Sequence, residues 1–175
     1  MLWLISDEHY YHQNIIKYTH RPFASMSDMV ASMIEANNSI VQPGDVVYHL
    51  GDFGLASRDR LRAILSRLTG VHILIRGNHD RGRTSCLNLG FVDVLPFKSL
   101  RYGDDRLYLT HRPMKELPDN HELVVHGHSH NNLTSPARPF NVNVSVEMTN
   151  YKPVNVDWVL DTWRTQCKIA RDNWS

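Results

Sequence analysis

The sequence predicts an α/β protein in which two β-sheets lie between outer helices. Short apolar runs typical of buried strands recur along the chain, and segments with helical apolar spacing separate several of them. The first half also alternates strand, helix and strand, which favours parallel pairing through a right-handed crossover. The 175 residues suffice for one hydrophobic core, so we expect a single domain over residues 1–175.

The first expected elements are a strand, a helix and a second strand. Residues 1–6 are interpreted as the first strand, because this apolar run is short and has no basic flank, unlike a signal sequence. Either Ser25 or Ser27 can cap a helix that continues to about residue 40. After a turn, residues 46–50 form the second expected strand.

The clearest helical pattern follows Ser57, which is its expected cap, and Gly70 ends it. Its apolar residues recur at i, i+3, i+4 and i+7, and they are Leu61, Ile64, Leu65 and Leu68. Residues 71–75 are apolar apart from one histidine and form the third expected strand. Because two strands flank this helix, we expect it to pack on the sheet.

The pattern changes in the second half of the chain. Residues 97–101 and 106–110 flank a turn and predict an antiparallel hairpin. Residues 123–125 are a short apolar strand, and residues 140–146 alternate apolar and polar side chains, which indicates a half-exposed strand. A last helix is expected from about Asn155. Its apolar stripe consists of Val156, Val159, Leu160 and Trp163.

Composition excludes several classes of protein. No run approaches the ~20 apolar residues of a membrane helix, so we expect no membrane partner. The two cysteines, Cys86 and Cys167, lie far from the polar clusters described below, which argues against a thiolate site and favours a reducing, cytoplasmic location. The net charge of +1 says little about partners. Arginines gather near the middle of the chain, where they either attract an anionic substrate or form the solvated face of the helix after Ser57.

Five short clusters of oxygen and imidazole ligands recur along the chain, and most of them follow an expected strand. Their candidate metal ligands are Asp7, His9, Asp52, Asn78, His111, His128 and His130. Imidazole groups argue against a magnesium-only site, and the lack of cysteine argues against a structural zinc cage. The sequence therefore predicts two divalent ions, with Mn²⁺ as the first expectation and iron, zinc or nickel as alternatives.

Two metal ions ~3.5–4 Å apart lower the pKa of a bound water and clamp the oxygens of an in-line displacement, which suits phosphoester hydrolysis. Asn78 ligates without cancelling charge, so two carboxylates, Asp7 and Asp52, and a bridging hydroxide would leave the centre at about +1. His79 follows Asn78 directly. It is the candidate general acid for the leaving alkoxide, and we expect it not to bind metal.

These motifs resemble those of the calcineurin-like metallophosphoesterases, which run D-x-H, G-D, G-N-H-[D/E], H and G-H-x-H in this order. The resemblance implies one metal on Asp7, His9 and His130, a second on Asn78, His111 and His128, and Asp52 as the bridge. The segments His12–Tyr18, Arg21-Pro22-Phe23 and Val47–Asp52 are similar to a small bacterial and phage-type branch. That similarity implies a four-layer α-β-β-α sandwich of two mixed sheets, with no regulatory domain.

The resemblance implies a metal-dependent phosphoric ester hydrolase that works by attack of a metal-bridging hydroxide. An acid at His79 favours small phosphodiesters, including nucleotides or cyclic nucleotides, and the alternative is a phosphomonoesterase of small metabolites. A non-catalytic interaction scaffold is the alternative from another class, although such proteins usually lose ligands. No long basic stripe supports polymeric nucleic acid, and a homo-oligomer is compatible with the sequence.

Some residues depart from the family pattern or have no assigned role. Many relatives carry a carboxylate at the position of Leu55 that orients the catalytic histidine, so His79 needs another partner, for which Asp80 or a backbone carbonyl is a candidate. Arg112, Arg21 and Asn14 are candidate substrate contacts. We expect His126 to pack or to support the site from behind. Packing or exposure is expected for His12, His20, His49, His72 and His121, and core or interface positions for Tyr151, Trp158 and Trp163.

Overall fold

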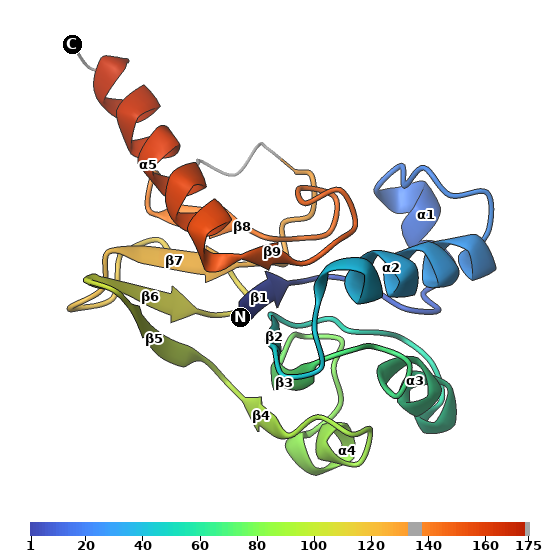
Figure 1. Cartoon of the computed structure of the whole chain (residues 1–175). Helices are drawn as coiled ribbons and strands as arrows, with labels where there is room; N and C mark the ends of the chain where they lie inside the picture. Colours follow the sequence, from blue (N-terminus) through green and yellow to red (C-terminus); the bar gives the residue numbers. More distant parts are fainter. Residues whose placement is uncertain (133–137, 174–175) are drawn as a thin grey trace.

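The computed structural model describes residues 1–132 and 138–173, and in it two sheets pack face to face (Figure 1). The first sheet has the order β4-β3-β2-β1-β9, in which β1 to β4 are parallel and β9 is antiparallel to β1. Its strands are β1 (Leu2–Ile5), β2 (Val46–His49), β3 (Val71–Ile75), β4 (Asp93–Leu95) and β9 (Val154–Asn155).

The second sheet has the order β5-β6-β7-β8. Its strands are β5 (Lys98–Tyr102), β6 (Asp105–Leu109), β7 (Leu123–His126) and β8 (Asn141–Asn143). β5 and β6 form the predicted antiparallel hairpin, whereas β6, β7 and β8 run parallel. Both sheets are therefore mixed.

The helices lie outside these sheets, as the sequence predicts. They are α1 (Ile15–Tyr18), α2 (Met26–Ile40), α3 (Arg58–Leu65), α4 (Arg83–Leu87) and α5 (Val156–Asp172). Apolar residues of α2, α3 and α4 pack on one face of the first sheet. α5 packs against β1, β8 and β9 and so joins the neighbouring edges of the two sheets. No helix among the described residues is long and apolar enough to cross a membrane.

Local capping explains where the three long helices begin. Ser25, Ser57 and Asn155 each accept a hydrogen bond from a backbone N–H in the first turn of α2, α3 and α5, respectively. Ser25, rather than Ser27, is the cap of α2. The expected stripe of α5 is also confirmed, because Val156, Val159 and Leu160 are buried and the partly buried Trp163 packs beside them.

A second apolar cluster fills the space between the sheets. Leu4 and Ile75 from the first sheet, and Leu50 directly after β2, meet Leu107 and Val125 from the second. The predicted half-exposed strand over residues 140–146 is wrong in part. The strand ends at Asn143, and the next three residues are buried. They are buried because the chain passes beside Ser6 at the end of β1, where backbone hydrogen bonds bridge the two sheets.

The short elements α1, α4, β4 and β9 are absent from the sequence prediction. They contain between two and five residues. A helical or alternating apolar period does not repeat over so few positions, and tertiary contacts determine such segments.

The packing between the sheets yields a prediction for stability. Leu107 is fully buried, so Leu107→Ala should lower the free energy of unfolding by about 2–5 kcal/mol. Urea denaturation of the metal-free protein measures this change. Leu55 is 47% exposed, and Leu55→Ala should change the free energy by less than about 0.5 kcal/mol. Similar losses in both variants would contradict a core between the sheets.

Candidate metal centre

The predicted ligands meet where the carboxyl ends of parallel strands from both sheets approach each other. Asp7, Asp52 and Asn78 follow β1, β2 and β3, while His111 and His128 follow β6 and β7. Two groups of ligand atoms lie there, each with all atoms within 4.8 Å of one another. One group consists of Asp7, His9 and His130, and the other of Asp52, His111 and His128.

The Asp7 carboxylate is fully buried, and its two oxygens have different environments. Oδ2 accepts hydrogen bonds from the His128 N–H, at 2.8 Å, and the Ser145 hydroxyl, at 2.9 Å. Oδ1 has no hydrogen-bond partner and lies 3.9 Å from His9 Nε2 and 3.8 Å from His130 Nε2. The backbone therefore holds one oxygen and leaves the other among imidazole nitrogens, where a cation could bind.

Asp52 belongs to the second group and also faces the first. Its Oδ1 accepts the His79 backbone N–H at 2.8 Å. Its Oδ2 is 3.7 Å from His9 Nε2 in the first group and 3.4 Å from His111 Nε2 in the second. This oxygen faces both groups, which is the position that the predicted bridging role requires.

His111 has a fixed orientation because Nδ1 donates to Leu50 O at 2.8 Å. The Nε2 atom then faces Asn78 Oδ1 at 3.0 Å and Asp52 Oδ2 at 3.4 Å. Burial lowers the pKa of His111, but the hydrogen bond and negative charge of Asp52 outweigh burial and raise it. The nitrogen Nε2 of His111 and the oxygens that it faces all carry lone pairs. A proton or a metal ion between them supplies the positive charge that makes this contact favourable.

His130 is oriented by Glu147, a residue that sequence reasoning missed. Nδ1 of His130 lies 3.1 and 3.2 Å from the two Glu147 oxygens, and Arg21 donates to the same carboxylate from Nε and from NH2. Burial would raise the pKa of Glu147, but the His130 hydrogen bond and the Arg21 charge lower it to about 2. A carboxylate that accepts from the far nitrogen of a ligating histidine is a common support of metal sites.

Buried polar atoms without partners test whether a metal ion fits here. Among the described residues, Asp7 Oδ1 and both ring nitrogens of His9 are buried and make no hydrogen bond. Such atoms are rare in folded proteins because each loses its hydration without compensation. These atoms belong to the first ligand group, and a cation on that group would satisfy Asp7 Oδ1 and one of the two His9 nitrogens. We conclude that the residues fit a metal centre.

The backbone at the candidate ligands is strained. Asp7, His9, Asp52, His128 and His130 all have positive φ, between 48° and 67°. Residues other than glycine rarely adopt this left-handed conformation, and strain of this kind gathers at functional sites. The turn after each strand therefore directs the side chain toward the centre at a conformational cost.

Two motif glycines are required by close packing. A Cβ at Gly127 would lie 1.9 Å from Ser6 Oγ and 2.2 Å from Asp7 Oδ2. A Cβ at Gly77 would lie 2.2 Å from Asp52 Oδ1. Any larger residue at either position would displace a candidate ligand.

The centre without ions is electrostatically unfavourable. Burial raises the pKa of Asp7 to about 6 and lowers the pKa of His9 to about 3, so burial disfavours the charged form of both. Asp52 behaves differently, because contacts with His111 and His9 and the His79 N–H outweigh its burial and lower its pKa to about 2. A divalent cation would favour the ionised carboxylates and the neutral imidazoles that metal binding needs.

His79 lies at the edge of the centre with its side chain 44% exposed, and its Nε2 is 4.0 Å from Asp52 Oδ2. Asp80 is not its partner. The Asp80 carboxylate instead accepts the backbone N–H groups of Gly77, Asp52 and Phe53, and it thereby joins the loops after β2 and β3. Leu55 is exposed and carries no polar group.

The three candidate substrate contacts have different environments. Arg112 is exposed and donates to Asn78 Oδ1 at 3.1 Å, so it lies beside the second ligand group. The structure does not support Arg21 as a substrate contact. Its side chain is fully buried and donates to Glu147 and to the carbonyls of Asp7 and Glu8. Its role is to hold the loop after β1. Asn14 is exposed and does not line the pocket described next.

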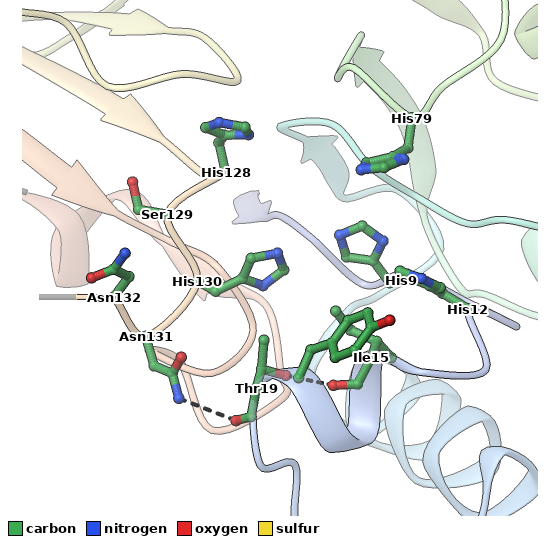
Figure 2. A pocket seen from close by; sticks show the side chains of 11 residues that line it. His9, His12, Ile15, Thr19, His79, His128, Ser129, His130, Asn131 and Asn132 are labelled. Atoms are coloured by element: carbon green, nitrogen blue, oxygen red, sulfur yellow. Dashed lines mark hydrogen bonds between the residues drawn. The ribbon is translucent and has the colours of Figure 1, made fainter.

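A pocket of about 710 Å³ opens beside both ligand groups. Figure 2 shows His128 and His79 on opposite walls, with His9 and His130 between them and His12 next to His9. The ring centroids of His12 and His79 are 6.2 Å apart. The sequence expectation of packing or exposure missed the pocket position of His12, whose only sequence signal is its place three residues after His9.

Two other histidines belong to a buried polar chain behind the centre. Glu8 hydrogen-bonds His49, whose Nε2 lies 2.9 Å from His72 Nδ1, and His72 Nε2 lies 3.3 Å from Leu68 O. If His72 donates to that carbonyl, His49 must donate to His72 and accept from a protonated Glu8. Burial raises the pKa of Glu8 and lowers that of His49 to about 3, which agrees with a neutral chain. These contacts agree with the structural role expected of both histidines.

The fold and the site together define an α/β protein that carries two groups of metal-ligating side chains where two mixed sheets meet. Residues 1–144 match the calcineurin-like phosphoesterase superfamily domain. The chain belongs to this superfamily, which confirms the resemblance drawn from its motifs.

Similar proteins come from archaea and bacteria. An uncharacterized protein of Methanocaldococcus jannaschii, MJ1445, is 36% identical over 168 residues, which cover 91% of this chain and 89% of that protein. The crystal structure of AQ665 from Aquifex aeolicus, a protein of unknown function, has a TM-score of 0.74 and 30% identity over 88% of this chain and 94% of its own. A novel archaeal phosphodiesterase shares the fold with a TM-score of 0.51 and 19% identity over 82% of this chain and 81% of its own.

The Glu147 contacts generate a prediction about metal affinity. Glu147→Gln removes the negative charge behind His130 and should lower the affinity for Mn²⁺ by about 10–100-fold. Isothermal titration of the metal-free protein measures this affinity, and circular dichroism checks the fold. Glu116 is exposed, and Glu116→Gln is the matched control. Equal Mn²⁺ affinity in all three proteins would contradict the supporting role of Glu147.

Proposed function

We propose that this protein is a binuclear metal-dependent phosphoesterase that hydrolyses small phosphoesters, with phosphodiesters as the favoured class and Mn²⁺ as the favoured metal. The observation that carries the proposal is the position of Asp52 Oδ2 between two ligand groups, 3.7 Å from His9 Nε2 and 3.4 Å from His111 Nε2. The superfamily to which the chain belongs supports the same chemistry.

One ion would be held by Asp7, His9 and His130, the other by Asn78, His111 and His128, and Asp52 would contact both. When bound, two divalent ions supply a nucleophile by lowering the pKa of a water and neutralise charge on the phosphate. The protein fixes its ligands in advance through hydrogen bonds of Asp7 with the His128 N–H, of His111 with Leu50 O, and of His130 with Glu147. Such preorganisation avoids reorganisation during the reaction.

His79 supports the preference for diesters. Its side chain faces the pocket at the rim of the centre, and its backbone N–H is tied to Asp52. From this position the imidazole can deliver a proton to the oxygen of a departing alkoxide. An alkoxide needs this protonation, whereas a more stable leaving group needs it less. Arg112, beside Asn78, is placed to donate to a phosphate oxygen.

Metal removal tests the binuclear centre. Stripping the protein with a chelator should abolish hydrolysis of aryl phosphate mono- and diesters, and Mn²⁺ should restore it better than zinc or iron. Asp52→Asn should reduce the bound metal from two ions to one or none, as measured by elemental analysis, whereas the exposed Asp119→Asn should retain both. Turnover by the stripped protein, or no turnover with any metal, would refute the proposal.

The acid role of His79 is tested separately. His79→Ala should keep both metal ions and slow hydrolysis of diesters that have alkoxide leaving groups by ~10²–10⁴-fold. The effect should shrink for p-nitrophenyl esters, whose leaving group needs little protonation. His121 lies in the loop before β7, where it hydrogen-bonds Ser99, and His121→Ala is the control. An equal loss for both leaving groups would show that His79 does not act as the acid.

A further inference from the structure

The pocket extends beyond the space that a phosphate needs. It continues from the ligand groups past His12 to the helix α1, where Ile15, Tyr18 and Thr19 line it. Its volume of about 710 Å³ lies within the range of about 300–1,000 Å³ that holds organic ligands of moderate size. Since the ions would hold the phosphate, the α1 end is available for the organic group that the ester carries.

The α1 end offers an apolar floor and an aromatic wall. Ile15 is buried with 3% of its surface exposed, whereas Tyr18 is 67% exposed and belongs to neither apolar core cluster. The His12 ring meets the Tyr18 ring edge to face, with centroids 6.1 Å apart and an interplanar angle of 75°. An exposed ring positioned beside a pocket provides a face on which a planar group can stack.

The polar groups at this end are uncharged. No lysine, arginine, aspartate or glutamate is among the described residues that line the pocket. Asn131 reaches α1 and donates from Nδ2 to Thr19 O at 3.1 Å (Figure 2). A second phosphate or another strongly anionic group would therefore meet no lysine or arginine among the described lining residues, which favours a neutral organic group at the α1 end.

We infer that the α1 end is a specificity subsite for a planar aromatic group, a nucleobase or an aryl ring, on an ester that carries a single phosphate. This inference rests on the proposed function for the phosphate end of the pocket. Tyr18 stacks on the ring, Ile15 packs against its edge, and His12 lies between this subsite and the candidate acid His79.

Matched ester pairs test the aromatic preference. The methyl esters of uridine 5′-phosphate and ribose 5-phosphate differ at the position of the base, and benzyl methyl phosphate differs from cyclohexylmethyl methyl phosphate mainly in its planar ring, since both release a primary alkoxide. The wild-type protein should have a higher kcat/KM for the aromatic member of each pair. A preference in the uridine pair alone identifies a nucleobase site, and one in both pairs identifies a general aryl site. Equal values within both pairs would overturn the inference.

Substitution of Tyr18 tests whether the subsite at the α1 end causes the preference for aromatic esters. Tyr18→Ala should lower kcat/KM for the aromatic esters roughly tenfold and change that for the other esters by less than about twofold, because it removes one stacking surface. Tyr18→Phe should keep the preference. Tyr102 is another exposed tyrosine, which bonds Asp157 in α5, and Tyr102→Ala is the control. An equal loss for all four esters in Tyr18→Ala would contradict stacking.

A binding measurement separates failure of the subsite from failure of the proposed function. Uridine without phosphate is added to the ¹⁵N-labelled metal-free protein, and ribose is added in parallel. Uridine, but not ribose, should shift the amide signals of Ile15, Tyr18 and Thr19, and Tyr18→Ala should weaken this binding. If no ester is hydrolysed with any metal, the proposed function fails, and the uridine titration still decides the subsite. Absence of these shifts in the wild-type protein would overturn the subsite.

Discussion

The buried carboxylate of Asp7 is the interaction on which the arrangement of the centre depends. Its Oδ2 atom accepts from the His128 N–H of the loop after β7 and from the Ser145 hydroxyl beyond β8, so a residue of the first sheet fixes two segments of the second. A Cβ at Gly127 would occupy the space of this oxygen. Because Oδ2 is used in this way, Oδ1 alone faces His9 and His130. One side chain thus joins the sheets and defines the first ligand group.

Strain in the ligand loops is offset by contacts around them. Five candidate ligands have positive φ, each a conformation that costs free energy in the isolated chain. Asp80 accepts three backbone N–H groups from the loops after β2 and β3, and Arg21 donates to the carbonyls of Asp7 and Glu8. Arg21 is buried and Asp80 is partly buried, and both make these hydrogen bonds as charged groups, so they stabilise the strained turns in a single geometry. The rigidity of these loops therefore maintains the spacing of the candidate ligands rather than the packing of the hydrophobic core.

The sequence singles out residues that the structure gathers in two groups, because strand ends and residues of ligand type are local patterns. Asp7, Asp52 and His128 each follow a short apolar run, and parallel strands bring such positions together. Glu147 and His12 could not be found in this way. Glu147 contacts Arg21 across 126 residues of sequence, and it directly follows residues 140–146, whose alternating pattern suggested a half-exposed strand. His12 lies in a turn before a four-residue helix, which no periodic signal marks.

Charge balance links the buried network to the pocket. Arg21 neutralises Glu147, so Asp7 and Asp52 are the two carboxylates left to face the ions. Two divalent cations with a bridging hydroxide would exceed these charges by about one, an excess concentrated where a phosphate would bind. The pocket itself contributes no cationic side chain among its described lining residues, so attraction of an anion depends on the metal ions, with Arg112 at the margin. Discrimination among esters must then come from uncharged groups, and among the described lining residues Ile15 and Tyr18 offer apolar surface away from the ligands.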